Sequence, residues 1–402
     1  MRILLLTILL QTGFASYAQD RCATSDYTEV QRAANPSEAK KIAEAESFVQ
    51  KISTLQARTV GPVQIKIPVV VHILYKDAYQ NISDAQVQSQ IDALNRDFRR
   101  LNADTTNTPQ RFLSVSADVQ VEFYLATADP KGRATSGILR KQTTVTNFLS
   151  NDKIKYSAQG GDDAWDSKSY LNIWVGRLAS GAGYSSVPGS DATKDGIVIN
   201  TGAFGTINVS GYYNLGRTAA HEIGHWLGLK HIWGDTQCGD DGIADTPPQS
   251  TYTQGCPAGF RTSCTNGETG DMYMNYMDYT ADACMNLFTE GQKKKMLAVF
   301  ASGGPRASFL QSRGLDKPWT EGSSDDGDAI KIVLYPNPAA AEITIKSTVE
   351  CIGKTISIIN ANGVVVQTVQ AKSALQKLNL STLKAGLYII RIEGATAKFI
   401  KL

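Results

Sequence analysis

The chain has 402 residues, 42% of them hydrophobic, so it can bury a sizeable core and has room for two or three domains rather than one. Its 40 basic and 38 acidic residues leave a formal net charge of +2, and the sequence contains no long run of basic residues. Composition therefore gives no electrostatic reason to expect a nucleic-acid partner, and partners must be inferred from sites.

The N-terminus has the pattern of a secretory signal. Arg2 precedes an apolar run at 3–10, and Ser16-Tyr17-Ala18 forms a small-x-small cleavage site, which predicts a signal peptide over 1–18. A membrane anchor, the alternative, would need roughly 20 apolar residues, and no later run supplies them. We expect a secreted or cell-surface protein, exported through the periplasm, with no membrane-spanning segment.

The segment 19–57 is polar, and the stretch SEAKKIAEAESFVQKI within it predicts a helix. The apolar run IKIPVVVHILY follows and predicts a buried strand, in which His72 is interpreted as an ordinary strand residue. A helix is predicted next, begun by a capping box of Ser83 and Gln86. Its apolar positions recur at spacings of four and three: Val87, Ile91, Leu94, Phe98 and Leu101.

Further strands are predicted in VQVEFYLAT, LNIWVGRL and GIVIN, and NLGRTAAHEIGHWLGL then begins a second helix. This order of strand, helix, strands and helix is typical of an α/β or α+β core. Between Asp235 and Asn286, glycine, proline, aspartate and cysteine crowd the sequence and regular periodicity is lost. We therefore predict that this half is irregular.

The cysteines divide into a group of four, Cys238, Cys256, Cys264 and Cys284, and two distant ones, Cys22 and Cys351. Export permits disulfides, and the four are spaced too widely for the CxxC pairs of a structural zinc site. Two disulfides that staple a loop-rich region are the favoured interpretation, and three pairings are open.

The C-terminal part has a different pattern. A loop-like linker at 317–329 separates the central domain at 58–316 from a β-patterned tail at 330–402. Short alternating strands with turns at Asn362-Gly363 and Ala385-Gly386 predict a small β-sandwich.

The stretch HEIGHWLGLKH holds three of the four histidines in the chain. His221 and His225 lie one helical turn apart and project about 40° from each other, so both can bind one metal ion. Gly228 allows the chain to turn and return His231 as a third ligand. Three imidazoles leave a catalytic zinc its open tetrahedral position, with Glu222 placed as a general base toward water. Chance or ordinary core histidines are the alternatives, and the full HExxHxxGxxH pattern disfavours them.

This extended motif resembles that of the metzincin metallopeptidases, which carry a methionine-containing turn below the metal. The stretch YMNYMDYTAD matches that turn, with Met277 as its methionine and Tyr279, two residues on, as the tyrosine near zinc. Met272 and Met274 are rival candidates for the turn methionine. The resemblance implies that Tyr279 stabilises the tetrahedral intermediate.

Within this clan, the stretch GRTAAHEIGHWLGLKHIWG, the four cysteines that follow it and the stretch MNYMDYTADACM resemble the pappalysins, in their short ulilysin-like branch. The resemblance covers residues 66–300. The resemblance implies an α+β fold: a two-subdomain zinc peptidase with a mixed sheet and active-site helix above, and an irregular disulfide-stapled half below. It also implies the pairs Cys238 to Cys264 and Cys256 to Cys284. Calcium is expected in the lower half, where Asp240, Asp241, Asp245 and Thr246 offer oxygen ligands, although an acidic solvated loop is an equal alternative.

The same resemblance implies latency and specificity. Pappalysins often silence zinc with a cysteine of the pro-segment, here Cys22, although Asp20 or Asp26 could serve instead. Asp282 matches the aspartate at the floor of the S1′ pocket, which implies cleavage before arginine, with lysine second. A solvated turn aspartate is the alternative for Asp282. Self-cleavage between Ala57 and Arg58 would then remove residues 19–57 as the pro-segment and release the catalytic domain at 58–316.

The tail resembles the C-terminal sorting domain of type IX secretion, on the stretches LYPNPAAAEITI, ISIINANGVVV, LKAGLYIIRI and KFIKL. This resemblance implies the secretion machinery as a partner. A carbohydrate-binding or adhesive module is the alternative for the tail.

Together these features predict a zinc metalloendopeptidase of protein and peptide substrates, with zinc as catalytic cofactor, calcium as a structural one and Glu222 as general base. The alternatives are a metzincin of another branch with different specificity and a non-catalytic, zinc-stabilised binding or adhesive protein. Because structural zinc sites fill all four ligand positions, three histidines and a nearby base favour the enzyme.

Overall fold

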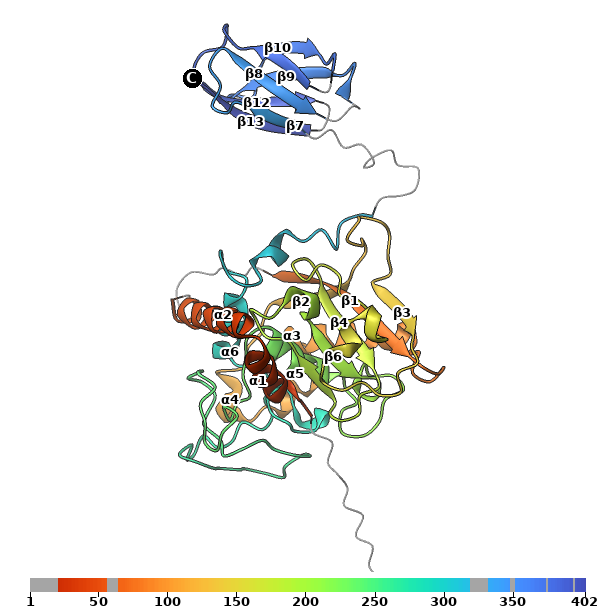
Figure 1. Ribbon diagram of the computed structural model, residues 1–402. Coiled ribbons are helices and arrows are strands. Elements are labelled where there is room, and N and C mark those ends of the chain that lie inside the picture. Colours follow the sequence, from red (N-terminus) through yellow and green to blue (C-terminus); the bar gives the residue numbers. More distant parts are fainter. Residues whose placement is uncertain (1–20, 56–63, 319–331, 348–350, 374, 393–394) are drawn as a thin grey trace, which may run out of the picture. The chain divides into compact units, whose positions relative to one another are not determined.

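The computed structural model divides the chain into two compact units, residues 1–318 and 319–402 (Figure 1). It describes residues 21–55, 64–318, 332–347, 351–373, 375–392 and 395–402. The predicted signal peptide, most of the predicted linker, Asp20 and the bond between Ala57 and Arg58 lie outside these residues.

A mixed six-stranded sheet organises the first unit, in the order β2-β1-β4-β6-β5, with β3 also paired to β1. All pairings are parallel except that of β5 with β6. The strands are β1 (Ile65–Tyr75), β2 (Val121–Leu125), β3 (Ile138–Gln142), β4 (Leu171–Gly176), β5 (Gly183–Ser185) and β6 (Ile197–Asn200). The central β1 is buried on both faces, which explains its continuous apolar run. The sequence did not indicate β3 or β5, and β5 forms an edge of the sheet.

Two helices, α3 (Asp84–Phe98) and α5 (Arg217–Trp226), pack on one face of the sheet. Ser83 caps α3 as predicted, but the Gln86 amide donates to the Phe204 carbonyl, so the structure shows only half of the capping box. Leu101 lies beyond the end of α3 and is 71% exposed, so the predicted apolar repeat stops at Phe98. Shorter helices are α4 (Gln110–Leu113) and α6 (Glu290–Ala298).

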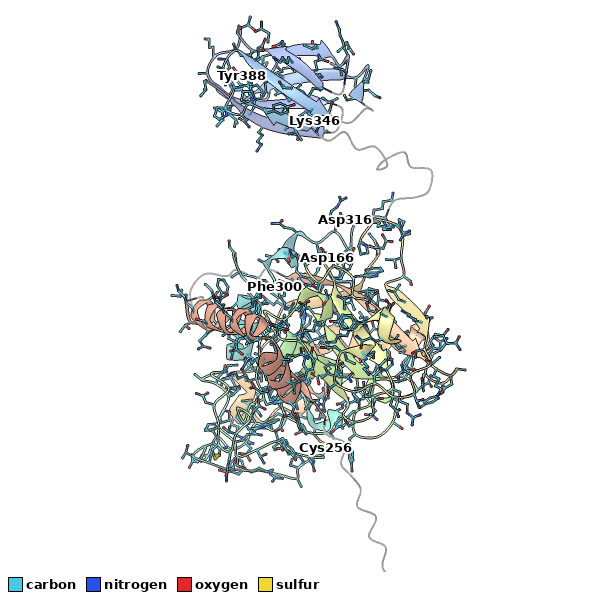
Figure 2. All side chains as sticks on the ribbon, in the orientation of Figure 1. Asp166, Cys256, Phe300, Asp316, Lys346 and Tyr388 are labelled. Carbon is cyan, nitrogen blue, oxygen red and sulfur yellow. A yellow bond between two sulfur atoms is a disulfide. The ribbon has the colours of Figure 1, made fainter. Side chains whose placement is uncertain are left out.

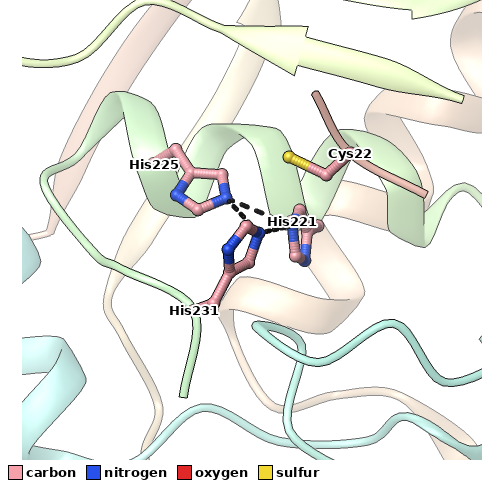
Figure 3. A group of neighbouring side chains, drawn as sticks. All are labelled: Cys22, His221, His225 and His231. Carbon is pink, nitrogen blue, oxygen red and sulfur yellow. Dashed lines mark hydrogen bonds between the residues drawn. The ribbon is translucent and has the colours of Figure 1, made fainter. Parts of the chain in front are cut away.

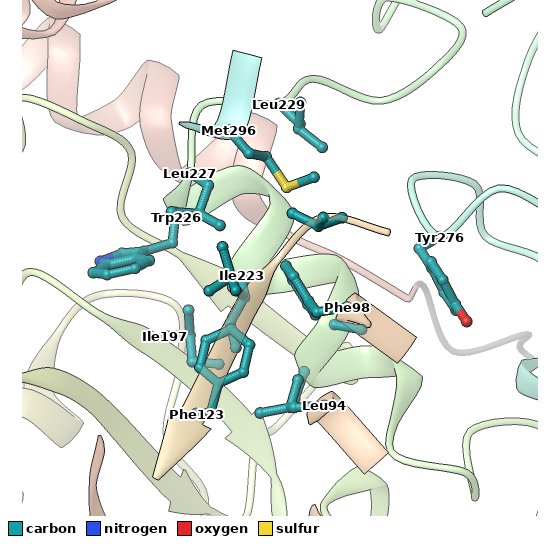
Figure 4. Close-up of a cluster of buried hydrophobic side chains, with 14 of the residues drawn as sticks. Leu94, Phe98, Phe123, Ile197, Ile223, Trp226, Leu227, Leu229, Tyr276 and Met296 are labelled. Carbon is teal, nitrogen blue, oxygen red and sulfur yellow. The ribbon is translucent and has the colours of Figure 1, made fainter. Parts of the chain in front are cut away.

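The core between this sheet and these helices combines residues far apart in sequence (Figure 4). Leu94 and Phe98 of α3 and Ile223 of α5 lie with Phe123 and Ile197 of the sheet, and all five side chains are at most 1% exposed. This packing fixes α5, and with it the histidine motif, against the sheet. Burial of each such side chain contributes about 1.5–3 kcal/mol.

Two further helices, α1 (Thr24–Ala34) and α2 (Pro36–Leu55), belong to the predicted pro-segment. Ile42 and Val49 of α2 are at most 2% exposed, and α2 packs on α6, while α1 packs on α2 and on β5 (Figure 1). The predicted pro-segment therefore packs on the rest of the first unit through apolar side chains, although its sequence holds few of them.

The second half of the unit is irregular, as predicted. Between Leu227 and Phe288 the described chain has one short helical turn, η7 (Asp282–Cys284), and otherwise loops, among which Figure 2 labels Cys256. Disulfides join Cys238 to Cys264 and Cys256 to Cys284, the pairs that the resemblance implies. The other 3-10 turns are η2 (Ala103–Asn107), η3 (Lys153–Lys155), η4 (Ser157–Gln159), η5 (Ala192–Lys194), η6 (Thr201–Ala203) and η8 (Ala307–Gln311).

The C-terminal unit is a small all-β domain. Its two sheets have the orders β10-β9-β12-β13 and β11-β8-β7 and share a core that includes Ile343, Ile358 and Ile390. The strands are β7 (Ile332–Tyr335), β8 (Glu342–Ser347), β9 (Thr355–Asn360), β10 (Val365–Gln370), β11 (Leu375–Asn379), β12 (Gly386–Ile392) and β13 (Ala395–Lys401). The predicted turn at Asn362-Gly363 joins β9 to β10, whereas Gly386 begins β12. In the part of the chain that the structure describes, no helix is long and apolar enough to cross a membrane.

Candidate active site

Three histidines converge at the C-terminal end of α5 (Figure 3). The Nε2 atoms of His221 and His225 lie 3.2 Å apart. The Nε2 atom of His231 lies 3.2 Å from that of His221 and 3.1 Å from that of His225. All three side chains are at most 3% exposed. The helix α5 ends at Trp226. As predicted, the chain turns at Gly228, whose φ is +91°, and this turn brings His231 back to the first two histidines.

The other ring nitrogens fix the tautomers. Nδ1 of His221 donates to the Tyr276 carbonyl at 2.7 Å, and Nδ1 of His225 donates to the Leu229 carbonyl at 2.9 Å. Nδ1 of His231 faces the Asp235 carboxylate at 2.5 Å. Burial lowers the pKa of His221 well below its usual range and that of His225 to about 3, so these rings stay neutral. The Nε2 atoms of His221 and His225 then present bare lone pairs toward each other and toward Nε2 of His231.

Three lone pairs that face one another repel unless a cation lies between them. Zn–N bonds of about 2.0–2.1 Å in a tetrahedral site place nitrogens at nearly the separations seen here. The donor set of three imidazoles, each held by a second hydrogen bond, therefore fits a zinc ion. In the described part of the chain, the cluster of His, Cys, Asp or Glu side chains that could hold a metal consists of these histidines and Cys22.

Met277 lies directly beneath α5. A Cβ atom built on Gly224 would lie 2.3 Å from the Met277 sulfur, so a larger residue at that position would force the Met277 side chain to move. Met277 is fully buried, and the rival methionines Met272 and Met274 are at most 2% exposed. Contact with the histidine helix distinguishes Met277 and supports its assignment as the turn methionine.

We expect Gly224→Ala to destabilise the catalytic unit by about 1–3 kcal/mol, because a new methyl group must displace buried Met277. Gly202→Ala is the matched control, since nothing lies within 4 Å of its Cβ position. Thermal or urea unfolding of both variants measures the difference. Equal stability of the two would show that Met277 does not constrain the helix.

Glu222 lies on the same helix and is fully buried. Its Oε2 accepts a hydrogen bond of 2.7 Å from the Thr24 hydroxyl and one of 3.5 Å from the Cys22 thiol. Burial raises the pKa of Glu222 to about 7, against the lowering effect of these two donors. A carboxyl group with a pKa near neutrality can both accept and return a proton, as a general base requires.

Cys22 completes the cluster from the pro-segment. One ligand atom from each of Cys22, His221, His225 and His231 lies within 4.8 Å of the others, and Figure 3 shows the cysteine side chain beside the histidine rings. Burial, and then the charge of Glu222, raises the pKa of this thiol. A cation among the imidazoles would oppose that effect and favour the thiolate.

The chain around Cys22 lies along β5. Cys22 forms a parallel bridge with Gly183, the Ala23 amide donates to the Gly183 carbonyl at 3.0 Å, and the Tyr279 hydroxyl donates to the Cys22 carbonyl at 3.0 Å. The Tyr279 ring also packs on His221 and His231, with centroids 5.7 and 4.9 Å away. Tyr279 therefore borders the histidine cluster and already binds a backbone carbonyl there.

Arg21 reaches Asp282 in a closed pocket. Its guanidinium lies 2.8 Å from Asp282 Oδ1, donates to the Thr280 carbonyl at 2.7 Å and stacks on the Tyr213 ring. Both charged side chains are 0% exposed. The other Asp282 oxygen accepts from the backbone amides of Leu215 and Arg217, at 2.8 and 3.2 Å. Asp282 thus has a fixed orientation and presents one oxygen to a cationic side chain.

The sequence did not indicate Arg21 or Thr24, although Arg21 directly precedes the cysteine that it did indicate. It also did not indicate Arg217, which donates to the Asp282 and Met285 carbonyls and pairs with Asp97 and Asp104. His72 lies in β1, between Asp162 and Asn172, apart from the histidine cluster. It is a strand residue, as interpreted.

The four residues predicted to bind calcium have other partners here. Both oxygens of Asp245 cap α6, accepting from the Thr289 hydroxyl and the Gly291 amide. Asp241 accepts from Thr246, and exposed Asp240 accepts from the Gly242 amide. Burial raises the pKa of Asp241 to about 7, and one of its oxygens has no hydrogen-bond partner. Calcium binding stays a prediction.

Comparisons with known proteins agree with this geometry. Residues 155–301 match a peptidase family described as pregnancy-associated plasma protein-A, and residues 333–402 match a secretion system C-terminal sorting domain. An extracellular metalloprotease of Uncinocarpus reesii is 43% identical over 145 residues, which are 34% of this chain and 48% of that protein. One from Arthroderma otae is 32% identical over 241 residues, 58% of this chain and 76% of that protein.

Two solved structures are similar over the first unit. Mature mirolysin of Tannerella forsythia in complex with a cleaved peptide is 48% identical, with a TM-score of 0.60 over 61% of this chain and 96% of that one. A promirolysin mutant of the same organism is 43% identical, with a TM-score of 0.68 over 74% of this chain and 100% of that one.

Proposed function

Because this chain belongs to the pappalysin family of metallopeptidases and carries a secretion sorting domain, we propose that it is a secreted zinc endopeptidase, made as a zymogen, that cleaves before arginine. The observation that carries this proposal is the Arg21–Asp282 ion pair beside Cys22 and the three histidines. Hydrolysis of gelatin by the processed enzyme, stopped by a zinc chelator and restored by zinc, tests it.

The histidines His221, His225 and His231 would hold the zinc ion, which supplies Lewis acidity and lowers the pKa of water. Glu222 acts as general base: its carboxylate takes a proton from the attacking water and returns it to the leaving amine. Tyr279, whose hydroxyl already donates to a carbonyl in the site, would stabilise the oxyanion of the tetrahedral intermediate.

Asp282 supports the preference for arginine. Its pocket encloses an arginine side chain completely, and the guanidinium makes a charge-assisted hydrogen bond there. The backbone carbonyl of Thr280 accepts a second hydrogen bond from the same group, which lysine's single ammonium cannot make in the same geometry. Arginine should therefore be preferred to lysine.

The direction of the pro-segment explains how it can fill the site without being cut. Arg21 precedes Cys22, so the chain passes first through the Asp282 pocket and then over the histidines. In a substrate with arginine after the scissile bond, the residue over the histidines comes before the arginine. The pro-segment therefore runs in the opposite direction to a substrate, and the bond that precedes Arg21 does not lie over the histidines.

Latency then follows from three contacts. Cys22 takes the place that water needs, Thr24 binds the general base Glu222, and Arg21 fills the specificity pocket. Asp26, the alternative to the cysteine, is exposed on α1. Self-cleavage between Ala57 and Arg58 would release the domain; this bond lies outside the described residues and its cleavage stays a prediction.

We expect Cys22→Ala to shorten the latency of the purified zymogen by about tenfold or more, because a thiolate ligand to zinc is lost. Asp26→Ala is the matched control and should mature at the wild-type rate. Processing followed on gels, together with hydrolysis of an arginine peptide, measures both. Faster maturation of the Asp26 variant alone would assign latency to the aspartate.

A further inference from the structure

A buried lysine lies beside the edge strand β5, outside the catalytic cluster. The side chain of Lys155 is 0% exposed, and its Nζ lies 2.9 Å from Asp152 Oδ1 and donates to the Lys194 carbonyl at 2.9 Å. Three aromatic rings surround the ammonium group, those of Tyr27 and Tyr184 at 5.0 Å and that of Trp174 at 5.5 Å. A buried charge needs such pairing, because its desolvation is costly.

One of the three rings around the Lys155 ammonium group, that of Tyr27, belongs to the predicted pro-segment. Tyr27, on α1, is 3% exposed, and its hydroxyl donates to both oxygens of Asp152, at 2.9 and 3.0 Å. Its ring lies 4.9 Å from that of Tyr184 in β5. The remaining walls, Asp152, Lys155, Trp174 and Tyr184, belong to the catalytic unit, and we call these four residues the phenol recess.

Loss of the pro-segment would uncover the phenol recess with its polar groups intact. Asp152 would lose two hydrogen bonds from the Tyr27 hydroxyl and one from the Gln31 amide, which lies 3.2 Å away. The exposed site would combine aromatic walls with a carboxylate and an ammonium group at its base. This arrangement is complementary to a phenol, which has an apolar ring and a hydroxyl that can donate.

The position of the phenol recess relates it to the substrate. Tyr27 follows Cys22 in a chain that runs opposite to a substrate, so the recess lies on the side where residues before the scissile bond must lie. The strand that carries Tyr184 also pairs with Cys22 at Gly183. A substrate bound along β5 with arginine at Asp282 would therefore pass the phenol recess with its N-terminal part.

We propose that the phenol recess of the processed enzyme is a second specificity pocket, which binds a tyrosine side chain of the substrate N-terminal to the scissile bond. The proposal rests on the proposed function, since it requires removal of the pro-segment. Phenylalanine would fill the aromatic walls but leave Asp152 without the hydroxyl donor, with only Lys155 as its partner. Arginine and lysine would be attracted by Asp152 and repelled by Lys155.

Matched peptides test this inference. Each has arginine after the scissile bond, and tyrosine, phenylalanine or alanine is placed in turn at each position before it. With the processed wild-type enzyme we expect kcat/KM for tyrosine to exceed that for phenylalanine by about tenfold or more at one position, as for a lost hydrogen bond to a charged group. Equal rates for tyrosine and phenylalanine at every position would overturn the proposal.

Two variants locate the effect. Asp152→Asn keeps an acceptor oxygen but loses its charge, so it should lower the tyrosine-to-phenylalanine ratio several-fold and keep the preference for arginine. Tyr156→Phe, the control in the same loop, should keep both. Among the described residues, the one hydrogen-bond partner of the Tyr156 hydroxyl is the Thr193 hydroxyl, and this contact lies at the surface. If the tyrosine-to-phenylalanine ratio of Asp152→Asn equals that of the wild-type enzyme, tyrosine does not bind in the phenol recess and the proposal is wrong.

Binding separates this proposal from the proposed function. Two peptides of residues 21–34, one with the natural Tyr27 and one with Tyr27→Phe, can be titrated by calorimetry into the processed wild-type enzyme. The titration measures binding, so it can be done even if the processed enzyme hydrolyses no peptide. About tenfold weaker binding of the phenylalanine peptide would support the recess, and equal binding would contradict it. Absence of all hydrolysis would instead count against the endopeptidase.

Discussion

Glu222→Gln should lower kcat of the processed enzyme by about a thousandfold or more while zinc stays bound, because the amide cannot take a proton from water. Its side chain does not contribute a ligand atom to the histidine cluster, and glutamine has nearly the same shape. The variant should therefore fold and bind the metal normally. Activity on an arginine peptide, zinc content by atomic absorption and the melting temperature check the three parts of this expectation.

The glutamine variant separates the general base from the metal site. His231→Ala is the comparison, since it removes a ligand and should lose both zinc and activity. A Glu222→Gln enzyme that hydrolyses peptides at the wild-type rate would refute the assigned base. If the variant loses zinc along with activity, Glu222 supports the metal site. The proton transfer must then be assigned to another group.

Asp282→Asn should reduce kcat/KM for an arginine peptide by about 10- to 150-fold, the 1.5–3 kcal/mol expected for a buried hydrogen bond to a charged group. The asparagine oxygen can still accept from the backbone amides of Leu215 and Arg217, so the loop should keep its shape. A peptide with leucine after the scissile bond is the internal control. Its slower hydrolysis should change little, so the preference for arginine should largely disappear.

The pro-segment gives this prediction a second readout. Asp282→Asn also removes the partner of Arg21, so the zymogen of this variant should lose part of its latency. Arg21→Ala should do the same without changing the specificity of the processed enzyme. If Asp282→Asn keeps the wild-type preference for arginine, Asp282 is a structural turn residue and the pocket lies elsewhere.

The histidine motif was predictable because its chemistry is local. Helical spacing places His221 and His225 on one face, and the glycine requirement at 228 is a property of the backbone, so the sequence contains the whole argument for the three ligands. The buried strand β1 and the helix α3 were predictable for the same reason, since hydrophobic periodicity records which faces are buried.

The features that were missed depend on contacts between distant segments. The strand β5 has three residues, Gly-Tyr-Ser, with no alternation that would mark a strand, and it is a strand because it pairs with β6, whose sequence lies 12 residues further on. Arg21 lies 261 residues before Asp282 in the sequence, and no local pattern relates them. The calcium ligands were predicted from the resemblance and from the oxygen atoms that these residues offer, neither of which indicates that Asp245 caps α6, and calcium binding itself stays a prediction.

A cleavage-site profile of the processed enzyme on a peptide library, with and without a zinc chelator, tests most directly that this is a zinc peptidase whose own Arg21 occupies its specificity pocket. We predict a strong preference for arginine, followed by lysine, directly after the scissile bond, and loss of all cleavage with the chelator. Cleavage that shows no preference for arginine at that position, or that continues without zinc, would contradict the account.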